Sequence, residues 1–163
     1  ATVPIQITTA EQMQALGAGI AKQLLAGDVV ILDGLLGAGK TTFVQGLAQA
    51  LGVQGAVTSP TFVMARVHKA SGEGVSLVHV DAYRLDEKSE LSDLDLEATP
   101  NAVFLIEWGL PYAKNFTENW LEVQITRSDF AADATDAASG LRTVEIIAVG
   151  ERWANLDLSR LEL

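Results

Sequence analysis

The chain is 163 residues long and 48% hydrophobic, which suits a single globular domain over residues 1–163 with a buried core. Its 21 acidic and 11 basic residues give a formal net charge of -10, and this charge disfavours direct binding to the phosphate backbone of RNA or DNA. The sequence has no cysteine, which excludes disulfides and thiolate metal sites, and no apolar run approaches the roughly 18 to 20 residues that span a bilayer. Because the N-terminus also lacks the layout of a signal peptide, we expect a cytoplasmic protein without membrane contact.

The first predicted elements are a strand and a helix. Residues 3–7 alternate apolar and polar positions as a short strand does. Thr8 or Thr9 then offers an N-cap for a helix. The apolar residues that recur at helical spacing in this helix are Met13, Leu16, Ile20 and Leu24. We expect the helix to end near Gly27.

A continuous apolar strand is followed directly by a glycine-rich loop. Residues 29–32 (VVIL) are typical of a strand buried on both faces, and residues 34–41 have the spacing G-x-x-x-x-G-K-T. In such a loop, backbone N–H groups and the start of the next helix, here predicted over residues 40–51, converge on a phosphate. Lys40 would neutralise β- and γ-phosphate oxygens, and the Thr41 hydroxyl would bind Mg²⁺. The nucleotide-binding residues predicted from this loop are Gly37, Ala38, Gly39, Lys40, Thr41 and Thr42.

The middle of the chain predicts two strands and a segment of mixed character. Residues 62–68 and 75–80 flank a turn-rich stretch and predict an antiparallel hairpin. Residues 58–61 (TSPT) lie where nucleotide switches place hydroxyls that sense the γ-phosphate, although a simple turn has the same composition. Residues 86–98 mix charges with leucines and are compatible with one or two short helices.

Two carboxylates follow predicted strands and are candidates for metal and water chemistry. Glu107 ends the apolar strand of residues 102–106, where a phosphate-loop site needs a carboxylate for the water shell of the metal. Asp81 follows the strand of residues 75–80 and is a candidate for orienting water or a magnesium ligand. Each has an ordinary alternative, which is a strand end at the solvent edge for Glu107 and a simple turn for Asp81.

Four other side chains allow more than one interpretation. Trp108 is either a packing residue or a contact residue beside Glu107. His68 and His79 lack the helical spacing of a metal pair, so structural or solvated roles are expected. Arg127, at the end of a later strand, is an open candidate for contact with the base or the phosphates.

The remaining strands complete an α/β fold. Residues 120–125 and 141–149 alternate like antiparallel edge strands, and the Asp- and Ala-rich residues 128–140 between them predict a mobile hairpin tip. We therefore expect a P-loop NTPase-like three-layer sandwich whose mixed sheet has parallel core strands and antiparallel edge strands. Helices would cover both faces, with the nucleotide at the carboxyl ends of the strands. The sequence leaves the strand order open.

Four motifs, in this order and spacing, resemble the TsaE family, also called YjeE. They are residues 34–43 (GLLGAGKTTF), 59–62 (SPTF), 79–85 (HVDAYRL) and 105–109 (LIEWG). The resemblance implies that Lys40 and Thr41 bind phosphate and Mg²⁺, that Glu107 binds the metal and that Asp81 is required for hydrolysis. It also implies that Thr9 lies near the nucleotide base and that Trp108 lies beside the site.

The family resemblance carries an activity and partners. TsaE proteins are ATPases that work with TsaB and TsaD in making threonylcarbamoyladenosine in tRNA. The resemblance implies a Mg²⁺-dependent ATP hydrolase that is weak alone, is stimulated by TsaB and TsaD, and meets tRNA only through them. We expect the chain to be monomeric when alone, although the sequence leaves the oligomeric state open. The net charge of -10 agrees with that division of labour. One departure is Leu35, where the family has Asp, so the role of that Asp is not carried over to this chain.

Two other functions remain open. A small-molecule kinase would need an arginine-bearing lid over the phosphoryl group, and the six arginines are scattered without a lid-like cluster. An adaptor that binds ATP without hydrolysing it is a second alternative, although the presence of Lys40, Thr41, Asp81 and Glu107 favours hydrolysis. ATP is favoured over GTP because no Asn-Lys-x-Asp guanine reader occurs.

Overall fold

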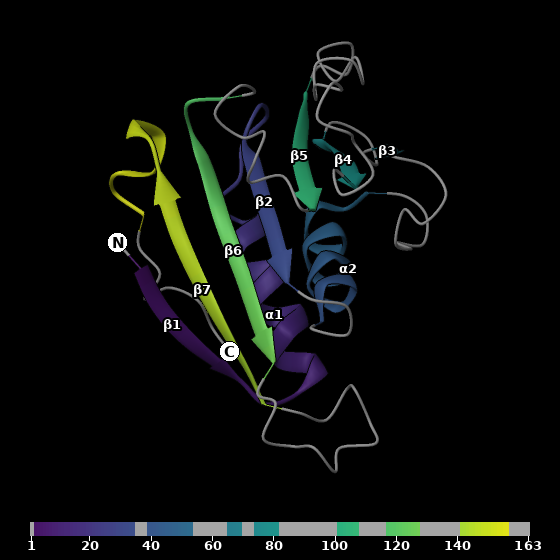
Figure 1. Cartoon of the computed structure of the whole chain (residues 1–163). Helices are drawn as coiled ribbons and strands as arrows, with labels where there is room; N and C mark the ends of the chain where they lie inside the picture. The colour runs from purple at the N-terminus through teal and green to yellow at the C-terminus, as the bar shows by residue number, and fades with distance from the viewer. Residues whose placement is uncertain are drawn as a thin grey trace.

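The computed structural model describes residues 2–34, 39–53, 65–69, 74–81, 101–107, 117–127 and 141–156, which form a seven-stranded sheet and two α-helices. The helices are α1 (Ala10–Ala21), α2 (Lys40–Leu51) and the short 3-10 helix η4 (Glu151–Trp153). The strands are β1 (Thr2–Ile7), β2 (Val29–Gly34), β3 (Ala65–His68), β4 (Ser76–Asp81), β5 (Ala102–Glu107), β6 (Trp120–Arg127) and β7 (Arg142–Val149) (Figure 1). No helix within these ranges has the length and apolar composition needed to cross a bilayer.

The sheet has a parallel centre and antiparallel margins, in the order β1-β7-β6-β2-β5-β4-β3. β6, β2, β5 and β4 are parallel, and the arrowheads of β2, β5 and β6 point the same way in Figure 1. β7 is antiparallel to β6 and β1, and β3 is antiparallel to β4. The predicted mixed sheet is confirmed, as is the hairpin of β3 and β4.

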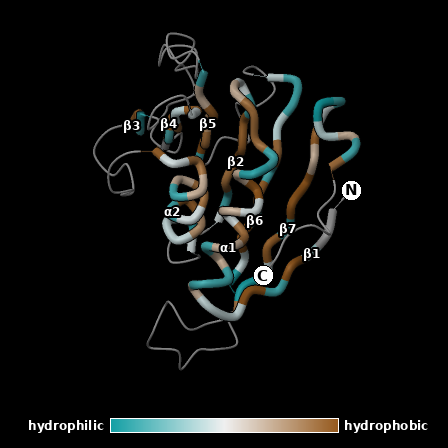
Figure 2. The backbone as a smooth tube through the Cα atoms, turned by 180° about the vertical axis from the view of Figure 1, so that it is seen from behind, coloured by the Kyte–Doolittle hydropathy of each residue, from teal (hydrophilic) through white to brown (hydrophobic). Residues whose placement is uncertain are grey.

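The central strands are buried on both faces. All six residues of β5 and the first four of β2 are buried. Val30 and Leu32 of β2 belong to the core cluster that also contains Phe43 of α2. Both helices lie on this face, in front of the strands when the molecule is seen from behind (Figure 2). Val29 and Ile31 point to the other face and are also buried, so the continuous apolar run reflects packing on two sides.

Helix α1 begins at the predicted cap and ends earlier than the sequence indicates. The Thr9 side chain accepts the N–H of Gln12 at 3.1 Å, and the Gln12 side chain accepts the N–H of Thr8 at 2.7 Å. The helix ends at Ala21, so the prediction that it continues through Leu24 is wrong. Leu24 is buried nonetheless and belongs to the core cluster, and its N–H bonds to the Ala21 carbonyl in a turn. Its spacing therefore reflects the core and not the helix.

The prediction that β6 and β7 are edge strands is also wrong. β6 lies between β7 and β2, and the true edges are β1 and β3. The face of β6 that packs in the core contributes Leu121, Val123 and Ile125, whereas Glu122 and Gln124 on its other face are only half-buried. Alternation along β6 therefore marks a sheet face with polar side chains and not a strand at the rim.

Three predictions concern residues outside the described ranges. They are the switch-like residues 58–61, the short helices of residues 86–98 and the hairpin tip of residues 128–140. The two α-helices of the described ranges lie on one face of the sheet, so the expectation of helices on both faces stays a prediction.

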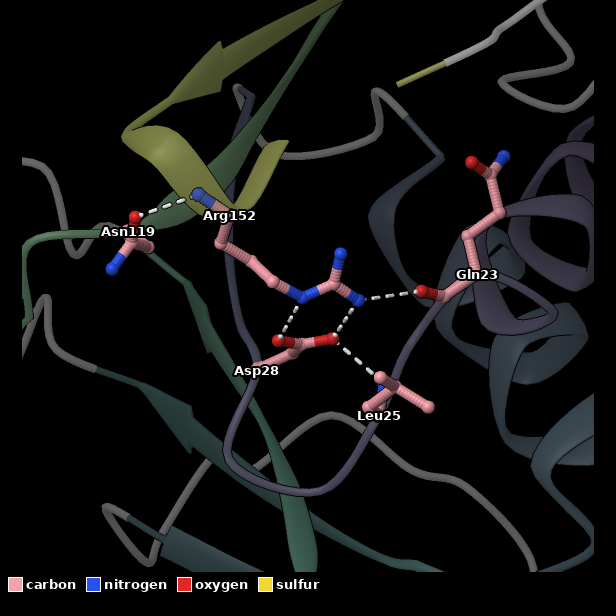
Figure 3. Close-up of polar contacts among 5 residues, drawn as sticks. All are labelled: Gln23, Leu25, Asp28, Asn119 and Arg152. Carbon is pink, nitrogen blue, oxygen red and sulfur yellow. Dashed lines mark hydrogen bonds and ion pairs between the residues drawn. The ribbon is translucent and has the colours of Figure 1, made fainter. Parts of the chain in front are cut away.

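An ion pair ties η4 to the residue before β2 (Figure 3). It lies at the amino end of β2, opposite the carboxyl ends of the parallel strands. Arg152 donates from Nε and Nη2 to the two carboxylate oxygens of Asp28 at 3.2 and 3.0 Å, and Asp28 also accepts the N–H of Leu25 at 2.6 Å. Arg152 further donates from Nη2 to the carbonyl of Gln23 and from its backbone N–H to the side chain of Asn119, both at 3.1 Å. The bidentate contact with Asp28 and the bond to Asn119 together join three segments that are distant in sequence.

We expect Arg152→Ala to lower the stability of the fold without changing nucleotide binding. The substitution leaves the Asp28 carboxylate, 8% exposed, without its cation, at a cost of about 1–3 kcal/mol. Thermal unfolding followed by circular dichroism would measure the loss. Lys22→Ala is the control, because Lys22 is an exposed cation at the end of α1. An unchanged unfolding midpoint for Arg152→Ala would contradict the structural role of the pair.

Candidate nucleotide site

The end of β2 and the start of α2 frame the site. β2 ends at Gly34 and α2 begins at Lys40, so the two elements flank the predicted phosphate loop. Gly39 caps the helix with a φ of 106°, a left-handed value that glycine adopts at little cost. The N–H groups of the first turn of α2 lack carbonyl partners within the helix. This end of the helix is therefore suited to an anionic ligand.

Glu107 points into the site and is buried there. It is the last residue of β5 and is 7% exposed. Its Oε1 lies 3.7 Å from Lys40 Nζ, and its Oε2 lies 2.7 Å from His79 Nε2. A buried carboxylate requires such partners, because an unpaired charge is strongly destabilised away from water. The alternative in which Glu107 merely ends a strand at the solvent edge is therefore wrong.

The register of the parallel strands brings Asp81 to the same place. Asp81 is the last residue of β4, and its Cα pairs with that of Glu107. Glu107 also lies opposite Leu32 of β2, two residues before that strand ends. The backbone of Asp81 therefore lies at the same edge as Glu107, whereas its side chain is outside the described part of the chain.

Helix α1 and strand β7 border the end of the loop on the other side. A Cβ placed on Gly39 would lie 3.3 Å from Met13 Cε and 3.6 Å from Arg142 Nε. Met13 donates its N–H to the carbonyl of Thr9, one turn earlier, so the start of α1 lies close to the loop. Arg142 is buried and pairs in register with Arg127 of β6. The structure therefore places the Arg142 side chain beside Gly39.

The structure places only some of the predicted site residues. It brings together Lys40, Glu107 and the backbone of Asp81. Thr41 is exposed and Thr42 is half-buried, and both belong to the first turn of α2. The predicted residues outside the described ranges are Gly37, Ala38 and Trp108, and Leu35 is outside them as well.

Two residues near the site were not predicted from the sequence. His79, expected to be structural or solvated, is 1% exposed and contacts the Glu107 carboxylate. The sequence could have indicated this position, because His79 lies two residues before Asp81 on the same strand and residues two apart share a face of the sheet. A site role for Asp81 therefore also places His79 on the face of the site. Arg142 gave no sequence signal beyond its place at the start of a strand.

The side chains at the start of α2 and at the end of β5 suit Mg²⁺ that is bound together with phosphate. Mg²⁺ prefers oxygen ligands, keeps several waters and is commonly held by one or two carboxylates plus substrate phosphates. Glu107 and the hydroxyl of Thr41 are donors of this kind. Within the described ranges, no three His, Asp, Glu or Cys side chains cluster as they would around a metal held by the protein alone. The donor set therefore fits a magnesium ion shared with a nucleotide.

Comparisons with known proteins agree with this geometry. Residues 7–135 match the family model described as Threonylcarbamoyl adenosine biosynthesis protein TsaE. The tRNA threonylcarbamoyladenosine biosynthesis protein TsaE of Streptomyces coelicolor is 49% identical over 151 residues, covering 91% of this chain and 99% of that protein. The protein of the same name from Bacillus subtilis is 37% identical over 137 residues, covering 82% of this chain and 79% of that protein. The crystal structure of Bacillus subtilis YdiB matches with a TM-score of 0.68 and 28% identity, covering 94% of this chain and 89% of that one. The chain belongs to the TsaE family.

Proposed function

We propose that this chain is a Mg²⁺-dependent ATPase that supports formation of tRNA N6-threonylcarbamoyladenosine by acting on a complex of TsaB and TsaD. The observation that supports this most directly is the pair of Lys40 and Glu107 at the start of α2. Their side chains are 12% and 9% exposed and lie 3.7 Å apart. The lysine of a G-x-x-x-x-G-K-T loop paired with a carboxylate at the end of a neighbouring strand is the arrangement that supplies the cation and the metal ligand for phosphoryl transfer.

Each side chain of the site has a distinct role in the proposed reaction. Lys40 neutralises β- and γ-phosphate oxygens, and the N–H groups of the first turn of α2 bind the phosphates. Thr41 and Glu107 hold the metal. Bound Mg²⁺ supplies charge neutralisation across the β- and γ-phosphate oxygens. Asp81, in register with Glu107, orients the attacking water.

Two neighbouring elements complete the proposed binding site. The start of α1, with Thr9, lies on the side of the loop that we assign to the adenine base. Arg142 adds a buried positive charge beside Gly39 and would favour a polyphosphate there. ATP is the proposed nucleotide because the sequence lacks a guanine-reading motif.

The names of the relatives and the charge of the chain support the proposed place in tRNA modification. The relatives from Streptomyces coelicolor and Bacillus subtilis are named for threonylcarbamoyladenosine biosynthesis in tRNA. A net charge of -10 disfavours direct contact with tRNA, so the partners would bind the RNA. Partners that complete or move the site are also the reason that we expect slow turnover by the chain alone.

The proposal is tested by measuring ATP hydrolysis of the purified chain with and without TsaB and TsaD. We expect hydrolysis to be slow alone and strongly stimulated by the two partners together, and to require Mg²⁺. The Lys40→Ala variant serves as the blank in both conditions. Tight ATP binding without any partner-dependent stimulation would favour an adaptor or a small-molecule kinase instead.

Asp81→Ala should keep ATP bound and lose turnover. If Asp81 orients water, its removal lowers the hydrolysis rate by roughly 100-fold or more, whereas the Kd for ATP changes little. Single-turnover hydrolysis and calorimetric titration of ATP separate the two effects. The control is Glu145→Ala, which removes a half-buried acid from β7. A fully active Asp81→Ala variant would sink the assignment.

A further inference from the structure

His79 sets the direction of the Glu107 carboxylate more firmly than Lys40 does. The distance from His79 Nε2 to Glu107 Oε2 is 2.7 Å, whereas Lys40 Nζ lies 3.7 Å from Oε1. An ionised carboxylate accepts hydrogen bonds and donates none, so Nε2 carries the proton and donates it. The first contact has the length of a strong hydrogen bond, and the second is a looser ion pair.

This hydrogen bond is built into the sheet and does not depend on a loop. The Cα of His79 pairs with that of Leu105 in the parallel register of β4 and β5, and Glu107 follows two residues later. Residues two apart on a strand share one face. Leu77 and Leu105, which flank the pair on that face, both belong to the core cluster beneath the helices. The donor and the acceptor are therefore held by two rigid neighbouring strands.

The burial of His79 is hard to explain by packing alone. The residue is 1% exposed, and its Nδ1 has no hydrogen-bond partner among the described residues. A buried polar atom without a partner costs about 1–3 kcal/mol. An apolar residue would avoid that cost at this position. The hydrogen bond to Glu107 explains a histidine here better than packing does.

We infer that His79 is a positioning residue that holds the Glu107 carboxylate in its metal-binding orientation. The inference rests on the proposed function and names the side chain that orients its metal ligand. If Lys40 contacted phosphate oxygens instead, the hydrogen bond from His79 would still hold Oε2 of Glu107, and Oε1 would be available to a bound metal and its water shell. Groups that hydrogen bond to a metal ligand typically change metal affinity about 10–100-fold when they are removed.

The test compares His79→Leu, which removes the donor, with His79→Gln, which keeps an N–H donor near the place of Nε2. Calorimetry gives the Kd for ATP with Mg²⁺ and the Kd for ATP in EDTA. We expect His79→Leu to raise the Kd for ATP with Mg²⁺ about 10–100-fold and to leave the Kd in EDTA nearly unchanged. His79→Gln should bring the Kd with Mg²⁺ most of the way back to the wild-type value. The matched control is His68→Leu, which removes another buried histidine, on β3, and should change neither Kd.

Two results would overturn the inference about His79. One is a His79→Leu variant that binds ATP with Mg²⁺ as tightly as the wild type. The other is an equal loss of affinity with and without Mg²⁺, which would make His79 a structural residue only. Failure of the proposed function gives a different result, because the wild-type chain itself would then bind ATP no better with Mg²⁺ than in EDTA.

A measurement on the wild-type chain keeps the inference testable if His79→Leu does not fold. The sequence has two histidines, so ¹⁵N-labelled histidine gives a simple spectrum that His68→Gln assigns. We expect His79 to be protonated at Nε2 and its Nε2–H signal to shift when Mg²⁺ is added to the ATP-bound chain. A His79 signal that ignores Mg²⁺ would overturn the inference.

Discussion

Lys40→Ala is expected to reduce ATP hydrolysis by roughly 100-fold or more, because it removes from a site shielded from water the positive charge that we propose neutralises the phosphates. The Lys40 side chain is only 12% exposed and lies 3.7 Å from Glu107, so water cannot easily replace its ammonium group. ATP binding should weaken as well, because in the proposed reaction Lys40 contacts phosphate in both the ground state and the transition state. Hydrolysis with TsaB and TsaD present and calorimetric titration of ATP measure the two losses.

Two variants make the Lys40 result specific. Lys22→Ala removes an exposed lysine at the far end of α1 and should leave hydrolysis unchanged. Lys40→Arg keeps the charge but replaces a compact ammonium with a planar, larger guanidinium, so it should rescue little activity. Wild-type activity in Lys40→Ala would show that the ammonium group is not part of the machinery.

The parts of the fold that the sequence predicts well are those defined by local patterns. The apolar runs of residues 29–32 and 102–106 predicted two buried strands, and both are central strands of the sheet. The loop spacing before Lys40 likewise predicted where α2 begins. The strand order and the interior position of β6 depend on pairing between segments far apart in the chain. Alternation along β6 reports which residues are buried, but it does not report which strand lies beside it.

The same distinction explains which site residues were found. Lys40 and Glu107 belong to short motifs whose chemistry can be recognised in the sequence. The contact between His79 and Glu107 spans 28 residues and exists because β4 and β5 are paired in a particular register. Arg127 was an open candidate for contact with the base or the phosphates and stays one, whereas its partner in the register, Arg142, lies beside Gly39 in the structure. Contacts that a sheet creates across strands need the register before they can be predicted.

Gly46→Ala is expected to lower the free energy of unfolding by about 1–3 kcal/mol. A Cβ on Gly46 would lie 2.6 Å from the Cα of Gln14 and would overlap its carbonyl oxygen. On the facing helix, a Cβ on Gly17 would lie 2.9 Å from the backbone nitrogen of Leu47. The two helices therefore touch backbone to backbone, and a rigid backbone cannot yield as a flexible side chain can. Alanine favours a helix over glycine by up to about 1 kcal/mol, which offsets only part of the strain.

The Gly46 substitution should also weaken ATP binding, because α2 carries Lys40 at its start. If α2 moves away from α1, the ammonium of Lys40 shifts relative to Glu107, which is fixed on β5, and displacements of about 1 Å in a catalytic site can be costly. Chemical unfolding and ATP titration of the same variant measure both effects. Gln45→Ala and Gln45→Gly, at the exposed neighbouring position, give the helix-propensity contribution alone. If the Gly46→Ala variant were as stable as the wild type, α1 and α2 could move apart without cost. The close contact between the two helices would then not be what holds Lys40 near Glu107.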